Sequence, residues 1–554
     1  MKLQDNQDLQ LSNQLISSLM EEIPHVQTFK GKWALIRTKL SDLPTHLNDL
    51  SDFPNFSTHP LSLELIHSIS QTLIDALSLA RNCRQPNLSA GKLRTQSDID
   101  AVAAKLHQHI QDCDLLLRSG VLPDAVLVFS ATASSKKEAV RVEARNLITR
   151  LQIGNPESKS AAMDSLLGLL QEDDKNVLIA VAQGVVPVLV RLLDSSCLDM
   201  KEKAVSAISR VSMVDSGKHV LLAEGVLLLN QLLRILESGS GFAKEKACIA
   251  LQALSFSKEN ARAIGSRGGI SSLLEICHAG TPGSQAVAAG VLRNLAGFPE
   301  IRENFIEENA VPVLIELSSS GTAMAQENSI GCLGNLVSSS DQGLKLLVAR
   351  EGGIECLKNY WEAAPSVRNL EDAVGLLTNM ASSRVIAEAL ISEGFLPRLV
   401  AVLSCEVSKV RIAAARAVYE LGFCTKTRKE LGEVGCIPLL VRMLEAKAVE
   451  EREAAAKALS SLMVYVGNTR VFRRDETGIP STVQLLDPCI NSLDKRFPIS
   501  ILASVVQSNR CRKLMVDSGA CVYLQKLSEM EIDGARKLLE NLRRGKLWGV
   551  FPRN

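Results

Sequence analysis

Asparagine and glycine recur together at three places in the second half of the sequence. The pairs, in which the glycine stands four residues before the asparagine, are Gly290 with Asn294, Gly331 with Asn335, and Gly375 with Asn379. A side-chain amide both donates and accepts hydrogen bonds. The chemistry that such a column offers is therefore hydrogen bonding rather than covalent catalysis.

This column contains more asparagines than chance explains, and its residue types lower the stability of a helix. The 24 asparagines among 554 residues would place about 0.4 of them in nine equivalent positions, whereas four are found when Asn541 is included. Within a helix, Asn is less favourable than Ala by roughly 0.5 kcal/mol and Gly by roughly 1 kcal/mol. A repeated column of both residue types therefore needs a structural or a binding reason, and the residues alone leave both open.

The column belongs to a repeat with a period of 41 to 43 residues. Each copy consists of a small residue, an aliphatic residue, often a proline, and a Leu-rich run. The copies begin at Gly184, Gly225, Gly268, Asn309, Gly352, Gly394, Gly435 and, one residue shorter, Gly478, with a weaker copy at Gly519. A fixed period in this range predicts a helical solenoid, in which stacked units share one continuous core.

Residues 261–300 show how one unit is built. A short helix is expected to end at Gly268, where glycine allows a left-handed backbone. A second helix follows over residues 270–276, and the segment 280–283 breaks it. Ser284 is then expected to cap a third helix, whose apolar residues recur every four positions. The asparagine column lies on these third helices. Pro498 should kink or delay one of them.

Three helices per unit with this punctuation resemble the armadillo repeat, over residues 137–541. The resemblance implies a right-handed, all-α solenoid whose concave groove binds an extended partner segment. It further implies that Asn294, Asn335 and Asn379 hold the partner's backbone, while the paired glycines allow close approach. We expect replacement of all three asparagines with Ala to abolish partner capture and to leave thermal stability nearly unchanged.

Basic residues replace the glycine later in the column. They are Arg416, Lys457 and Lys537. With Arg416 and Lys457 included in the groove, this change predicts a partner that is acidic towards that end.

The first 120 residues do not follow the repeat. Amphipathic segments at residues 11–23, 33–50, 61–83 and 97–117 predict an up-and-down four-helix bundle. Ala80-Arg81-Asn82-Cys83, Gly91-Lys92-Leu93 and Gln96-Ser97-Asp98 resemble the N-terminal helical domain of plant U-box ubiquitin ligases, although no space remains for a U-box. We therefore expect a plant armadillo protein without a U-box. The predicted domains are a bundle (1–120), a linker (121–136), a solenoid (137–545) and a tail (546–554).

Composition bears on which other functions the chain could have. Its formal net charge is +1, and the 13 cysteines form no CxxC pair. Six of the eight histidines lie in the first 120 residues, but the nearest pair, His107 and His109, faces different sides of a helix. We therefore expect no metal, no cofactor, no nucleic-acid partner, no integral membrane association, and a cytoplasmic or nuclear location.

The function expected from these features is that of a non-catalytic adaptor or scaffold. No phosphate-binding loop, nucleophile elbow or HExxH zinc motif occurs, so no enzyme activity is expected. Two alternatives remain. One is a role in a ubiquitin-ligase pathway, which the U-box resemblance suggests. The other is nuclear import, but importin-α places tryptophans where Gly290, Gly331 and Gly375 stand here. The sequence names no partner and no oligomeric state.

Overall fold

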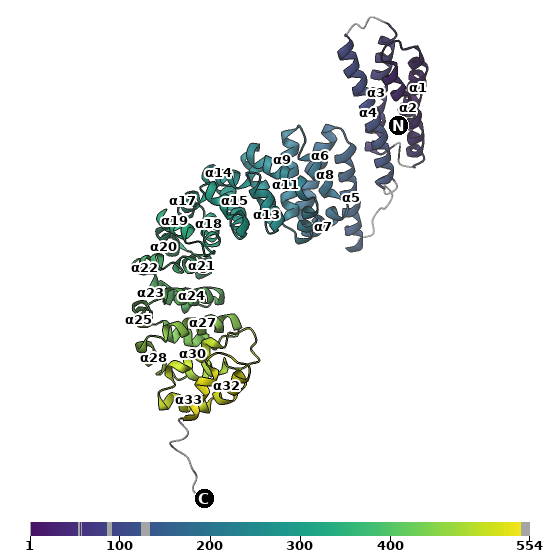
Figure 1. The fold of residues 1–554 in the computed structure, drawn as a ribbon. Helices are drawn as coiled ribbons and strands as arrows, with labels where there is room; N and C mark the ends of the chain where they lie inside the picture. Colours follow the sequence, from purple (N-terminus) through teal and green to yellow (C-terminus); the bar gives the residue numbers. More distant parts are fainter. Residues whose placement is uncertain (1, 54–55, 57, 86–90, 123–132, 545–554) are drawn as a thin grey trace. The chain divides into compact units, whose positions relative to one another are not determined.

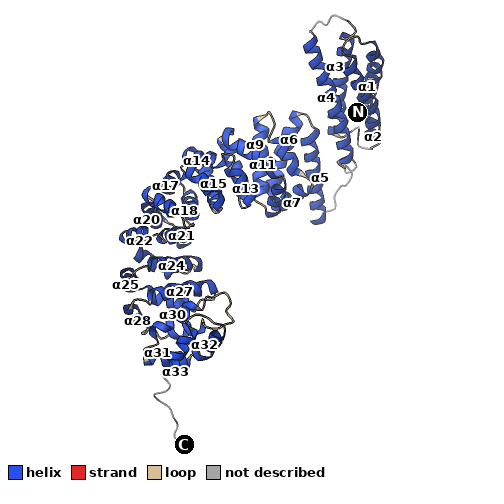
Figure 2. Ribbon diagram, in the orientation of Figure 1, coloured by secondary structure: helices blue, strands red, loops and turns tan. Residues whose placement is uncertain are grey.

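The computed structural model describes residues 2–53, 56, 58–85, 91–122 and 133–544. Helices dominate these ranges, and no strand occurs in them (Figure 2). The chain forms two compact units, Met1–Leu254 and Ser255–Asn554. The all-α prediction is confirmed. The expected tail at residues 546–554 lies outside the described residues.

The N-terminal segment is the predicted four-helix bundle (Figure 1). Its helices are α1 (Lys2–Glu22), α2 (Lys30–Ser51), α3 (Pro60–Asn82) and α4 (Lys92–Arg118). Helix α1 packs on α3, and α4 packs on both α2 and α3. Trp33 and a row of buried Leu and Ile side chains fill the core. The first helix begins nine residues earlier than expected and the fourth five, while α2 continues through Pro44.

The rest of the first unit contains the beginning of the solenoid. Its helices are α5 (Ala133–Ile153), α6 (Pro156–Glu172), α7 (Asp174–Ala182), α8 (Val185–Leu192), α9 (Leu198–Ser212), α10 (Asp215–Ala223), α11 (Gly225–Ser238) and α12 (Gly241–Leu254). Because α5 begins at Ala133, the expected linker was wrong at its end: residues 133–136 are already helical. Residues 123–132 of that linker lie outside the described residues.

The second unit continues the repeat as triplets of helices. The first helices are α13 (Lys258–Gly265), α16 (Arg302–Glu307), α19 (Gln342–Arg350), α22 (Arg384–Ser392), α25 (Thr425–Glu433), α28 (Val466–Phe472) and α31 (Asn509–Asp517). The second helices are α14 (Gly269–Ala279), α17 (Ala310–Ser320), α20 (Gly353–Ala363), α23 (Phe395–Leu403), α26 (Cys436–Met443), α29 (Gly478–Gln484) and α32 (Ala520–Glu529). The third helices are α15 (Pro282–Ala296), α18 (Ala323–Leu336), α21 (Leu370–Ala381), α24 (Ser408–Leu421), α27 (Val449–Leu462), α30 (Arg496–Val505) and α33 (Ala535–Arg544).

Left-handed residues separate the first helix from the second, as the repeat predicted. Gly268 has a φ of 73°, and Asn309 has a φ of 51°. Asn tolerates this conformation better than most residues with a side chain, which explains why it can replace glycine there. The N-cap of α15 was predicted at Ser284, one turn too late. Thr281 is the cap, and its side-chain oxygen accepts the Ser284 backbone N–H at 3.2 Å. Pro498 falls in the first turn of α30, whose start is delayed as expected.

The third helices of the second unit stack in chain order. Helix α15 packs on α18, α18 on α21, α21 on α24, α24 on α27, and α27 on α30. Their buried side chains are mostly Ala, Leu, Val and Ile, which permit close packing of successive layers. We call the side of this stack that carries the asparagine column the third-helix face.

Candidate binding groove on the third helices

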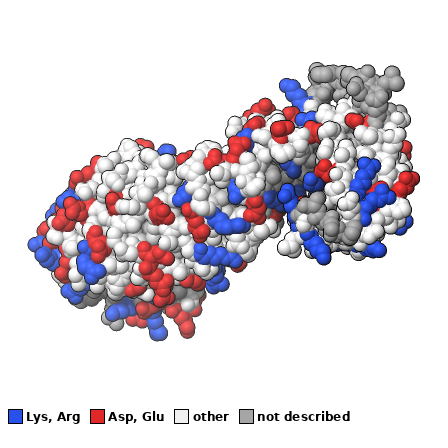
Figure 3. Space-filling model, turned by 90° about the horizontal axis from the view of Figure 1, so that it is seen from above, with Lys and Arg blue, Asp and Glu red and all other residues white. Residues whose placement is uncertain are grey.

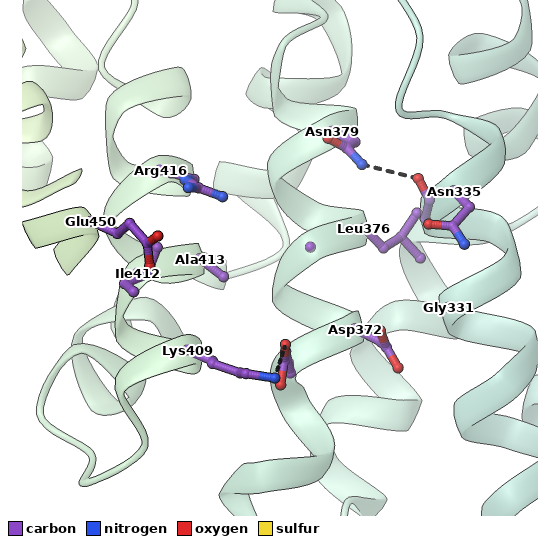
Figure 4. A pocket seen from close by; sticks show the side chains of 13 residues that line it. Gly331, Asn335, Asp372, Leu376, Asn379, Lys409, Ile412, Ala413, Arg416 and Glu450 are labelled. Carbon is purple, nitrogen blue, oxygen red and sulfur yellow. Dashed lines mark hydrogen bonds and ion pairs between the residues drawn. The ribbon is translucent and has the colours of Figure 1, made fainter. Parts of the chain in front are cut away.

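A cleft of about 380 Å³ opens where α18, α21 and α24 meet on the third-helix face (Figure 4). Its lining residues are Gly331, Gly334, Asn335, Glu371, Asp372, Gly375, Leu376, Asn379, Lys409, Ile412, Ala413, Arg416 and Glu450. The cleft brings together five residues predicted from the sequence, namely Gly331, Asn335, Gly375, Asn379 and Arg416. Gly290, Asn294 and Lys457 do not line it.

A second cleft, of about 350 Å³, lies one repeat further along the same face. Its lining residues are Thr378, Arg416, Tyr419, Glu420, Glu450, Glu453, Ala454, Lys457, Asp494 and Phe497. Arg416 and Glu450 line both clefts, so the two are parts of one groove. Lys457 lies here, with its Nζ atom 4.3 Å from the centre of the Tyr419 ring.

The predicted asparagines join neighbouring helices through their amide nitrogens. The Nδ2 atom of Asn335 donates to the Arg293 carbonyl oxygen at 2.9 Å, and that of Asn379 donates to the Gly334 carbonyl oxygen at 3.0 Å. Asn294 donates to Ser255 Oγ at 2.9 Å. No hydrogen bond from the described residues reaches the Oδ1 atoms of Asn335 and Asn379. In each of these two amides the nitrogen therefore joins neighbouring helices, while the oxygen is still available as an acceptor.

The three glycines have different surroundings. Gly290 is buried in α15. At Gly331, an added Cβ would stand 2.6 Å from Arg293 Nε, so this glycine makes room for the protein's own arginine. At Gly375, an added Cβ would meet no atom of the described residues within 4 Å, apart from the backbone of its own helix. We call the space above Gly331 the filled notch and the space above Gly375 the open notch. The sequence predicted that a partner backbone approaches these glycines closely. Of the two notches, only the open one has room for it.

Arg293 occupies the filled notch and bridges two repeats. Its Nη2 atom donates to Asp372 Oδ1 at 2.8 Å, reaching from α15 across α18 to α21. Burial raises the pKa of the Asp372 carboxyl, and the Arg293 guanidinium opposes that rise. Sequence reasoning missed this pair, because the two residues are 79 positions apart and neither recurs at its equivalent position in the next repeat.

Carboxylates outnumber cations along the groove. The first cleft has Glu371, Asp372 and Glu450 against Lys409 and Arg416. The second has Glu420, Glu450, Glu453 and Asp494 against Arg416 and Lys457. The basic residues that suggested an acidic partner are thus surrounded by a larger number of acids. Over the face drawn in Figure 3, acidic and basic side chains both occur, in keeping with a net charge of +1.

The described residues contain no group of three or more His, Cys, Asp and Glu side chains that could hold a metal ion. In the same part of the chain, no single helix is long and apolar enough to cross a membrane. Two bent helix pairs do pass by length and composition, α7 with α8 and α10 with α11.

Comparison with known families gives two matches. Residues 10–121 match a domain of unknown function, DUF7032, and residues 162–213 and 298–338 match the armadillo/beta-catenin-like repeat. The chain therefore carries armadillo repeats preceded by an N-terminal domain of this kind. The comparison with curated proteins gives no match.

Two solved structures of engineered proteins, both Northeast Structural Genomics Consortium targets, are similar to the chain. The first is 24% identical, with a TM-score of 0.62, and the match covers 72% of this chain and 99% of the engineered protein. The other is 22% identical, with a TM-score of 0.39, and covers 43% of this chain and 98% of its own. The first likeness concerns the fold alone. Fold and repeats together define an all-α armadillo solenoid. Proteins of this class typically act as protein-binding scaffolds and are typically non-catalytic.

Proposed function

We propose that this protein is a non-catalytic scaffold that binds an extended segment of a partner protein along the third-helix face of its second unit. The observation that carries the proposal is the cleft between α18, α21 and α24. It gathers residues from three successive repeats that the sequence had already singled out. Such continuous surfaces are the usual binding sites of repeat proteins.

The groove offers the hydrogen-bonding groups that an extended backbone needs. Every residue of such a segment presents an N–H donor and a C=O acceptor that require partners once buried. The Oδ1 atoms of Asn335 and Asn379 can accept from N–H groups one repeat apart. Arg416 has no ion-pair partner among the described residues and extends from α24 towards α21, where it can donate to a carbonyl oxygen (Figure 4).

The proposal is tested by filling the cleft without touching its hydrogen bonds. Gly375→Trp places a large side chain where the structure has open space, in an otherwise regular helix. Partners are captured from native tissue with the wild-type chain and identified by mass spectrometry. We expect Gly375→Trp to lose them and a matched control, Gly168→Trp, to retain them, because Gly168 is an exposed helical glycine of α6 with equally open surroundings. Equal capture by both variants would contradict the proposal.

We also propose that the chain is a plant armadillo protein whose N-terminal domain is related to that of the U-box ligases, and that it acts in the cytoplasm or nucleus. The support is the sequence resemblance around residues 80–98, within the segment that matches DUF7032. Imaging of a fluorescent fusion in plant cells tests the location. Exclusion of the fusion from both compartments would contradict it.

A further inference from the structure

The structure shows how this fold binds an arginine, because it binds one of its own. The Arg293 side chain lies over Gly331, where the missing Cβ leaves it room. Its guanidinium ends on Asp372 at 2.8 Å and on Asn328 Oδ1 at 3.5 Å. The filled notch is therefore a complete arginine site: a glycine floor, and a partly buried carboxylate at the far end.

One repeat further along, the glycine floor recurs, but Gly334 replaces Arg293 and Ala413 replaces Asp372. The residue equivalent to Arg293, immediately before the column asparagine, is Gly334. The floor equivalent to Gly331 is Gly375, which faces open space. Two glycines thus leave empty the volume that Arg293 fills in the repeat before, and the cleft of about 380 Å³ is the result.

The charges around the open notch favour a cation. Asp372 also lines this cleft, and its Oδ2 atom has no hydrogen bond from the described residues. Glu450 has no ion-pair partner among them either. Lys409 forms an ion pair with Glu371, with its Nζ atom 3.8 Å from Oε1. Among the described residues Arg416 has no ion-pair partner, and it projects from α24, across the cleft from Asp372 of α21 (Figure 4).

We propose that the open notch receives an arginine side chain of the bound partner segment, in the place where the preceding repeat carries its own Arg293. This inference rests on the proposed function, because it names the side chain that the groove selects. The guanidinium lies over Gly375 and pairs with the free oxygen of Asp372, with Glu450 close by. An arginine is favoured over a lysine because the filled notch holds a planar, multiply donating guanidinium over the same kind of glycine floor.

The test uses three labelled 12-residue peptides and the full chain. Arg, Gln or Glu occupies every second position in an otherwise Ala and Ser sequence, and binding is followed by fluorescence anisotropy. We expect the Arg peptide to bind about 10-fold more tightly than the Gln peptide, which is about 1.4 kcal/mol and close to the lower end of the range for a hydrogen bond to a charged group. The Glu peptide should bind most weakly.

Gly334→Arg is the decisive variant, since it transplants Arg293 into the next repeat. Its Cβ would stand 3.6 Å from the nearest atom, Leu376 N, so the helix accepts a side chain there. We expect the Arg peptide to fall to the affinity of the Gln peptide. Gly334→Ala, which adds no guanidinium, and Gly168→Arg, which adds the same charge in α6, should both keep wild-type binding.

The outcomes separate the two proposals. Tightest binding by the Glu peptide, unchanged binding of the Arg peptide to Gly334→Arg, or no binding of the Arg peptide at about 1 mM each overturns the arginine site. If Gly375→Trp still loses the captured partners, the groove proposal survives that result. If Gly375→Trp retains them as well, both proposals fail.

Discussion

The filled notch and the open notch occupy the same place in successive repeats but differ at two positions, because Gly334 replaces Arg293 and Ala413 replaces Asp372. Both have a glycine floor on a third helix, and both touch Asp372. In the first, Arg293 crosses the floor and closes the surface. In the second, Gly334 stands in the equivalent position and the surface stays hollow. A solenoid therefore repeats its backbone at each unit, while one or two side chains decide whether a unit presents a closed surface or a cleft.

The largest effect is expected from emptying the filled notch. Arg293→Met removes the guanidinium and leaves the partly buried Asp372 carboxylate unpaired. We expect a loss of about 2 kcal/mol of unfolding free energy, less than for a fully buried pair because part of the Arg293 side chain is exposed. Urea unfolding measures it. Adding Asp372→Asn should restore part of the loss, and an equal loss in the single and double variants would argue against the ion pair as its cause.

The asparagine column should show the next largest effect. The sequence suggested that replacing Asn294, Asn335 and Asn379 with Ala would hardly change stability. Each Nδ2 atom, however, donates to a neighbouring group at 2.9 to 3.0 Å. Losing these bonds, partly offset by the better helix propensity of Ala, should cost about 1.5 kcal/mol in total.

A matched asparagine tests this reading. Asn359 is exposed in α20 and forms no hydrogen bond with the described residues. Asn359→Ala should stabilise the protein by about 0.5 kcal/mol. If the triple variant melts at the wild-type temperature, the three asparagines do not stabilise the fold and serve binding alone.

A methyl group at the filled notch should disturb Arg293. In Gly331→Ala the new Cβ meets Arg293 Nε at 2.6 Å, so the guanidinium must leave its place over the helix. We expect a net loss of about 1 kcal/mol, because weakening the pair with Asp372 outweighs the gain in helix propensity. Thermal unfolding measures the change, and a stabilised Gly331→Ala protein would show that Arg293 has another equally good position.

The same methyl group at the open notch should have the smallest effect and the opposite sign. Gly375→Ala adds a Cβ that meets no described residue within 4 Å beyond the backbone of its own helix. We expect the protein to gain about 0.5 to 1 kcal/mol from helix propensity. Destabilisation in the same thermal experiment would mean that the space above Gly375 is already occupied.

Much of the fold and part of the site could be predicted from the sequence. The period fixed the helix triplets, and left-handed Gly268 and Asn309 marked their joints as expected. The column placed Asn335, Asn379 and Gly375 on one surface. The expected linker ended too late, because a polar, small-residue segment such as residues 133–136 can also begin a helix.

The charge of the groove could not be predicted in the same way. Arg416 and Lys457 follow the column and were visible as a pattern. Glu420 stands in the asparagine column itself, but Glu450 and Glu453 occupy other positions of α27, so no single column revealed all three. They converge only when α24, α27 and the start of α30 are stacked.

The sequence by itself determined that this chain is an all-helical solenoid, because periodic apolar residues and glycine joints act locally within each unit. It also determined which helix carries the asparagines. Only the tertiary structure decided which glycine faces open space. Arg293 reaches Asp372 across an intervening helix and 79 positions of sequence, and such a contact exists only once three repeats have been stacked.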